Sequence, residues 1–76
     1  MKEKILAMLE KELPEIDFRE DVALVDDGIL DSFTLAVIIT NLSIEFDITI
    51  PQEEIIEDNF NSVDSMVELV KRLKSN

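Results

Sequence analysis

The chain has 76 residues, of which 46% are hydrophobic and 5% aromatic, so it forms one small domain, expected to have a core of Ile, Leu, Val and Met. It has no cysteine and no histidine, which excludes disulfides, thiolate chemistry and the commonest general base and metal ligand. A net charge of −11 disfavours nucleic acid and anionic membranes as partners. No segment is apolar enough for a secretory signal or a membrane span, so we expect a cytoplasmic protein. We also expect it to be a monomer.

Residues 1–30 predict one helix followed by a long loop. Ile5, Leu6, Leu9 and Leu13 have helical spacing, which predicts a first helix over about residues 2–13 that Pro14 ends. Residues 14–30 contain two acidic clusters and the turn signal at Gly28. We expect this loop to be ordered, because it carries scattered apolar anchors, namely Ile16, Phe18, Val22, Leu24, Val25, Ile29 and Leu30.

The rest of the chain predicts three more helices. Residues 32–46 lack Gly and Pro and predict a second helix, and "DITIP" (47–51) predicts a short extended link. Pro51 suits the first turn of a short third helix, "PQEEIIED", which "NFNS" interrupts. Ser62 can cap a last helix whose inward residues are Val63, Met66, Val67, Val70 and Leu73. The predicted fold is all-α: a small antiparallel four-helix bundle with three longer helices and one short helix, forming a single domain over residues 1–76.

The second predicted helix is apolar on two opposite faces. One face is a normal core stripe, formed by Leu35, Ile38, Ile39, Leu42 and Phe46. The opposite face carries Phe33, Val37, Thr40 and Ile44, of which only Thr40 is polar. Either this helix is buried all round, or its outer face meets a partner. A bundle of short helices has little room for an enclosed member, so we favour partner contact.

Ser32 stands where an acidic turn meets this helix, and several functions are open to it. Asp31 or Ser32 could simply cap the helix. A catalytic serine is disfavoured, since no histidine and no Gly-x-Ser-x-Gly elbow accompany it, so we predict no catalytic residue. No frame through the acidic loop fits an EF-hand, so we predict no metal site. A phosphate ester on Ser32 would suit the free N–H groups at a helix start.

The central segment resembles the acyl carrier protein family. "LVDDGILDSFTLAVIITNLSIEFDITIPQEE" (24–54) contains Asp31-Ser32, Glu45-Phe46 and Ile50-Pro51 at the family's places, with Phe33 where the family has Leu. "NFNSVDSMVELVKRL" (59–73) stands in place of the family's closing helix. The resemblance extends over the chain and is supported by its length and acidity.

The resemblance implies that Ser32, flanked by Asp31 and Phe33, is the attachment site of 4′-phosphopantetheine, which a phosphopantetheinyl transferase takes from coenzyme A. It also implies that the protein is not an enzyme. It would instead present a thioester to an acyl- or aminoacyl-loading enzyme and to downstream transferases or synthases. The expected function is an acyl carrier of fatty acid or related specialised acyl biosynthesis. The alternatives are an aminoacyl or peptidyl carrier, including the D-alanyl type, and an interaction module without an arm.

The partner surface departs from that of fatty-acid carriers, whose corresponding helix is acidic on its outer face. The matching positions here are Thr34, Val37, Ser43 and Ile44, and the acidity lies instead in the preceding loop and at Glu53, Glu54, Glu57 and Asp58. This favours a specialised free-standing carrier. We predict a partner interface formed by Phe33, Val37, Thr40, Ile44, Glu53 and Glu54.

Overall fold

Four α-helices and one 3-10 turn form the regular structure of the described residues, 1–18 and 23–75, in a computed structural model. They are α1 (Lys2–Glu12), α2 (Ser32–Phe46), the 3-10 turn η1 (Gln52–Glu54), α3 (Glu57–Phe60) and α4 (Val63–Ser75). The predicted all-α bundle of three longer helices and one short helix is confirmed for this part of the chain.

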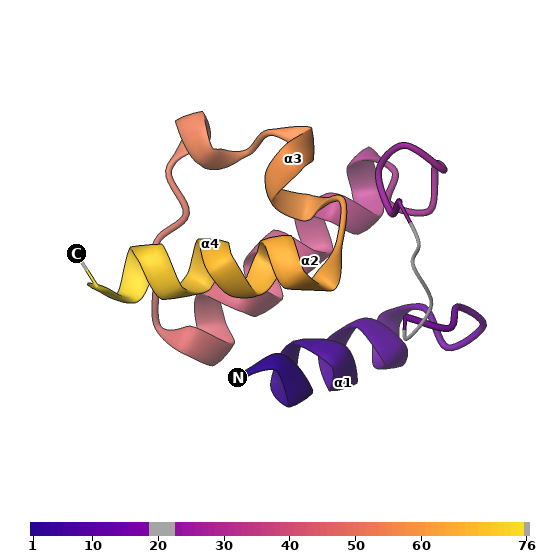
Figure 1. The fold of residues 1–76 in the computed structure, drawn as a ribbon, viewed down its shortest axis with the longest axis horizontal. Helices are drawn as coiled ribbons and strands as arrows, with labels where there is room; N and C mark the ends of the chain where they lie inside the picture. The colour runs from indigo at the N-terminus through magenta and orange to yellow at the C-terminus, as the bar shows by residue number, and fades with distance from the viewer. Residues whose placement is uncertain (19–22, 76) are drawn as a thin grey trace.

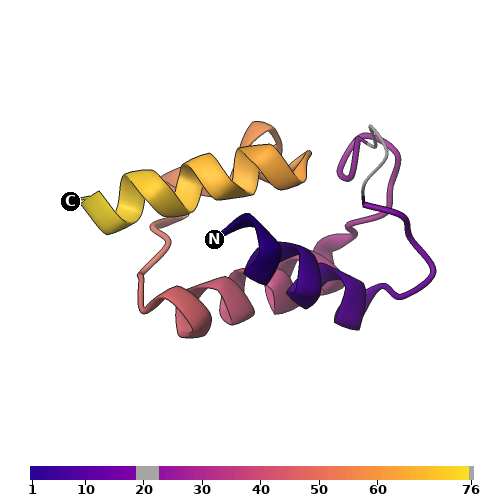
Figure 2. The same ribbon diagram turned by 60° about the horizontal axis from the view of Figure 1, so that its bottom comes forward.

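The three longer helices pack against one another in a bundle, and α3 packs on α4 (Figure 1). Two views show that α1 runs antiparallel to both α2 and α4 (Figures 1 and 2). Between α2 and α4 the chain runs back along the bundle through η1 and α3, so α4 begins at the same end as α2. The start of α2, the loop before it and the α3–α4 junction therefore lie at one end of the molecule.

The core contains aromatic residues as well as the expected aliphatic ones. Three of the four phenylalanines, Phe18, Phe46 and Phe60, are buried. The expectation of an Ile, Leu, Val and Met core was therefore incomplete, because a phenylalanine ring buries more surface than any of these side chains and a small domain has few other ways to fill its interior. The remaining buried residues are Ile5, Leu9, Leu24, Leu30, Ile38, Leu42, Val63, Met66, Val67, Leu69 and Val70.

The ends of the longer helices follow from local sequence. At the end of α2, Asp47 takes a left-handed conformation (φ 52°), and the N–H groups of Asp47 and Ile48 both bond to the carbonyl of Ser43. At the start of α4, the Ser62 hydroxyl accepts a 3.0 Å hydrogen bond from the N–H of Ser65, which confirms the predicted cap. The inward face of α4 is also confirmed, with the addition of Leu69, which the sequence analysis missed.

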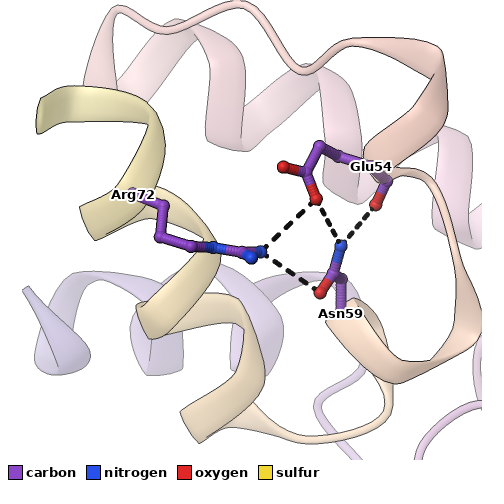
Figure 3. Close-up of polar contacts among 3 residues, drawn as sticks. All are labelled: Glu54, Asn59 and Arg72. Carbon is purple, nitrogen blue, oxygen red and sulfur yellow. Dashed lines mark hydrogen bonds and ion pairs between the residues drawn. The ribbon is translucent and has the colours of Figure 1, made fainter. Parts of the chain in front are cut away.

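The predicted third helix over 51–58 is wrong. The chain forms η1, leaves it at Ile55 and is extended at Ile56 (φ −126°, ψ 156°) before α3 begins at Glu57. Two contacts favour this path: Phe60 is fully buried, and the side-chain amide of Asn59 donates to the main-chain carbonyl of Glu54 at 2.7 Å (Figure 3). A continuous helix would place neither group where it makes its contact.

The described parts of the loop between α1 and α2 are anchored as predicted. Phe18, Leu24 and Leu30 are buried, and Ile16, Val25 and Ile29 pack against the core. The predicted anchor at Val22 lies outside the described residues. No helix of the described chain combines the length and the apolar character that crossing a membrane requires.

Candidate functional site

Ser32 is the first residue of α2, and the residue before it caps the helix. The carboxylate of Asp31 accepts a 2.8 Å hydrogen bond from the N–H of Thr34, which is the usual N-cap geometry. Ser32 itself is exposed, and its hydroxyl has no hydrogen-bond partner among the described residues. Of the two possible caps in the sequence, Asp31 is therefore the one used. Among the described residues, nothing engages the Ser32 hydroxyl, so it is available for modification.

The turn before α2 brings the chain to Asp31 in a fixed conformation. Gly28 has a φ of 75°, a region that side chains rarely adopt, and its N–H bonds to the carbonyl of Val25 at 3.0 Å. Leu30 is buried, and its N–H bonds to the carbonyl of Leu24 at 2.9 Å. The two residues before Ser32 are thus one buried anchor and one helix cap.

One negative charge, on Asp31, lies at the start of α2, where a phosphate ester on Ser32 would be attached. The N–H of Thr34 holds the pKa of Asp31 below its usual value, so this carboxyl is ionised at neutral pH. The first turn of the 15-residue α2 carries no other acid. Because Asp31 already occupies the Thr34 N–H, a phosphodiester on Ser32 would extend from the helix start into solvent. The exposed position of the Ser32 hydroxyl fits a group attached in this way.

The outer face of α2 is exposed at its two ends. Phe33 is 79% exposed and Ile44 is 75% exposed, so the alternative of a helix buried on all sides is wrong. Val37, between them, is half-buried, and Thr40 is exposed with its hydroxyl bonded to the carbonyl of Ala36 at 3.0 Å. Phe33 and Ile44 are separated by 11 residues, or about 16 Å along the helix axis. Phe33 and Ile44 are therefore two separate exposed apolar positions, and only Phe33 adjoins Ser32.

Ile44 belongs to a groove between α2 and α1 of about 410 Å³. Met8 and Ala7 of α1 contribute its other apolar lining, and its remaining lining residues are Lys4, Lys11, Glu12, Asn41 and Glu45. Cations and carboxylates are equal in number here, so the groove lacks the acidic excess of the whole chain.

The two predicted acidic contact residues differ in their surroundings. Glu53 is exposed. The carboxylate of Glu54 instead accepts hydrogen bonds from Asn59 at 3.1 Å and from Arg72 at 3.4 Å, which ties η1 to α3 and α4 (Figure 3). Among the described residues, no group of three acidic side chains is arranged to hold a metal ion.

Sequence reasoning missed two exposed apolar residues and one polar anchor. Ile55 is 38% exposed and Ile56 is 52% exposed, and both directly follow the acidic 3-10 turn η1. The adjacent isoleucines were a signal, because two neighbouring residues on a short element cannot both face the core. Asn61 bonds to the loop before Ser32, and no local sequence pattern indicates that contact.

Comparison with known proteins identifies the family. A D-alanyl carrier protein of Lactococcus lactis subsp. lactis is 33% identical over 76 aligned residues, which cover 97% of this chain and 96% of that protein. A D-alanyl carrier protein of Lactobacillus delbrueckii subsp. bulgaricus is 39% identical over 54 residues, covering 71% of this chain and 68% of that protein. The chain belongs to the carrier protein family of these relatives.

This membership confirms the resemblance to acyl carrier proteins. The protein is a carrier and not an enzyme, as the resemblance implied. No family model matches the chain, and no solved structure matches it. A more specific function is therefore inferred from the relatives, the helical fold and the exposed Ser32.

Proposed function

We propose that this carrier protein holds D-alanine on a 4′-phosphopantetheine arm attached to the hydroxyl of Ser32. The observation that carries the proposal is that Asp31 caps α2 and leaves the exposed Ser32 hydroxyl without a partner among the described residues. The relatives named D-alanyl carrier protein support D-alanine over the fatty acid cargo expected first. They give no support to a role in lipid metabolism.

The attachment step follows from the chemistry of the serine. Ser32 Oγ forms a bond to the phosphorus of the phosphopantetheine half of coenzyme A, and the pyrophosphate P–O bond breaks. The adenosine bisphosphate half leaves with the bridging oxygen. The serine proton passes to a base of the transferase, since the chain contains no histidine and the Asp31 carboxylate is bonded to Thr34. Once attached, the arm supplies the thiol that holds an aminoacyl group as a thioester.

Phe33 adjoins Ser32 and is the residue that supports a docking role most directly. It is 79% exposed, whereas the other three phenylalanines are buried. We propose that the phosphopantetheinyl transferase and the aminoacyl-loading enzyme contact Phe33. The exposed Glu53 and the acidic loop would draw in basic enzyme surfaces and raise the rate of encounter.

The attachment test weighs the intact protein. The purified chain is incubated with coenzyme A and a broad-specificity phosphopantetheinyl transferase, and its mass is compared with that of Ser32→Ala. A gain of one phosphopantetheine in the wild type alone is expected. An unchanged wild-type mass, or a gain that persists in Ser32→Ala, would overturn the proposal and leave the interaction module without an arm.

The cargo test is separate. The arm-bearing protein is incubated in an extract of its native host with labelled D-alanine, L-alanine or a fatty acid. Label that is released by neutral hydroxylamine is expected with D-alanine alone, because a thioester is cleaved by this reagent. Labelling by the fatty acid alone would restore the fatty acid function and reject the D-alanyl one.

A further inference from the structure

Asn61 connects the α3–α4 junction to the loop before Ser32. Its side-chain oxygen accepts hydrogen bonds from the N–H groups of Val25 at 2.8 Å and Asp26 at 3.1 Å. Its main-chain carbonyl accepts from the N–H of Leu24 at 2.8 Å, and its side-chain nitrogen donates to the Asp26 carboxylate at 3.1 Å. One residue thus makes four hydrogen bonds to three consecutive loop residues.

These bonds cap a helical turn from outside its own segment. The N–H of Asp27 bonds to the carbonyl of Ala23 at 2.8 Å, so residues 23–27 form a single turn whose first N–H groups lack partners within it. Asn61 supplies those partners, as an N-cap residue does in a continuous helix. A turn this short is not stable by itself, so its conformation depends on the cap.

Asn61 is in turn held by the core. It lies between Phe60, which is fully buried, and Ser62, whose hydroxyl caps α4. From the capped turn, the Leu24 carbonyl accepts the N–H of Leu30, which precedes Asp31 and Ser32. A chain of hydrogen bonds therefore links the α3–α4 junction to the residues that begin α2.

We propose that Asn61 is a positioning residue for Ser32. It fixes the loop and thereby the approach of the transferase to the serine hydroxyl, without touching the reacting atoms. This inference rests on the proposed function, since it takes Ser32 as the residue that is modified. Asn61→Ala should lower kcat/KM for phosphopantetheine transfer about tenfold, because removing the partner leaves two loop N–H groups unsatisfied.

Exchanging the side-chain amide of Asn61 and the carboxylate of Asp26 between the two positions distinguishes a positioning role of Asn61 from a general loss of stability. In Asn61→Asp two carboxylates face each other, which should slow transfer about as much as Asn61→Ala does. Asp26→Asn alone should have little effect, because the new amide can turn its oxygen toward Asn61. In the double variant Asn61→Asp/Asp26→Asn, the amide introduced by Asp26→Asn donates to the carboxylate introduced by Asn61→Asp, whose oxygens still accept the loop N–H groups, so transfer should return to near the wild-type rate.

Two measurements complete the test. Val70→Ala removes core packing from α4 and none of the hydrogen bonds that Asn61 makes to the loop; it should lower the Tm at least as much as Asn61→Ala while leaving transfer at 25 °C unchanged. Amide hydrogen exchange, which needs no transferase, should be faster at Val25, Asp26 and Leu30 in Asn61→Ala and normal in the double variant.

The outcomes distinguish this proposal from the proposed function. A wild type that accepts no phosphopantetheine rejects the proposed function, and the exchange measurement then still decides whether Asn61 orders the segment before Ser32. Unchanged exchange at Leu30 in Asn61→Ala would overturn the positioning role. A double variant as slow as Asn61→Asp would overturn it as well.

Discussion

Lys74 donates a 3.1 Å hydrogen bond from its Nζ to the main-chain carbonyl of Phe46, so the end of α4 caps the end of α2. The last turn of α2 has no basic residue of its own, and the chain has no Lys or Arg between Glu20 and Val70. A cation at a helix C-terminus satisfies free carbonyls and interacts favourably with the helix dipole. Lys74→Met should therefore lower the free energy of unfolding by about 1 kcal/mol, measured by urea denaturation.

Lys71→Met is the matched control for this change. It removes the same charge from the same helix, but among the described residues the Lys71 side chain pairs only with Glu68, in an exposed ion pair at 4.0 Å. Its effect should stay below about 0.5 kcal/mol. Equal effects of the two variants would mean that net charge, rather than the contact with Phe46, determines the loss.

The contacts of Asn59 should contribute more to stability than those of Arg72, although both residues bind Glu54. Asn59 donates to the Glu54 main-chain carbonyl at 2.7 Å and to its carboxylate at 3.1 Å in a partly buried setting (Figure 3). Arg72 reaches the same carboxylate at 3.4 Å with half of its side chain exposed. Asn59→Ala should cost about 1–2 kcal/mol and Arg72→Ala less than about 1 kcal/mol in urea denaturation. A larger loss in Arg72→Ala would contradict this order.

The position of α3 shows where prediction from sequence reaches its limit. Both ends of α1 and α2 and the start of α4 were predicted to within one residue of those observed, because each helix combines a long apolar repeat with a cap or a proline. A four-residue helix has no such repeat, and its stability comes from packing. The burial of Phe60 and the contact between Asn59 and Glu54 place it, and both depend on the rest of the fold.

The candidate site, like the fold, was predictable from the sequence only where local context indicates a residue's role. Ser32 and the exposed Phe33 could be found from local context, because a polar pair before a two-faced helix is visible in the sequence. The choice between Asp31 and Ser32 as the cap could not, since both residue types cap helices well. The role of Asn61 could not be predicted either, because its partners Leu24, Val25 and Asp26 lie 35 to 37 residues away along the chain.

Leu69 is the buried residue of α4 that is missing from the predicted inward face. α4 contacts α1, α2 and α3, so its buried sector is wider than one stripe, and Leu69 is fully buried. Leu69→Ala should lower the free energy of unfolding by about 2–5 kcal/mol, as for other enclosed leucines. Leu73→Ala is the control, because Leu73 was predicted to face inward and is only partly buried. A loss in Leu73→Ala that equals the loss in Leu69→Ala would contradict the observed packing.

The Asp31 cap should make the stability of α2 depend on pH in a defined direction. The hydrogen bond from the Thr34 N–H lowers the pKa of Asp31 because it favours the ionised carboxyl. The contribution of the cap is therefore complete above the unfolded-state pKa of about 3.9 and is lost as the pH falls through the lower pKa of the folded state. The Tm difference between wild type and Asp31→Ala should be constant from about pH 7 to pH 5 and shrink below about pH 4. Ser32→Ala should change the Tm little at any pH, because the Ser32 hydroxyl has no partner among the described residues. A Tm loss in Ser32→Ala as large as that in Asp31→Ala would show that the serine shares the cap and is not free for modification.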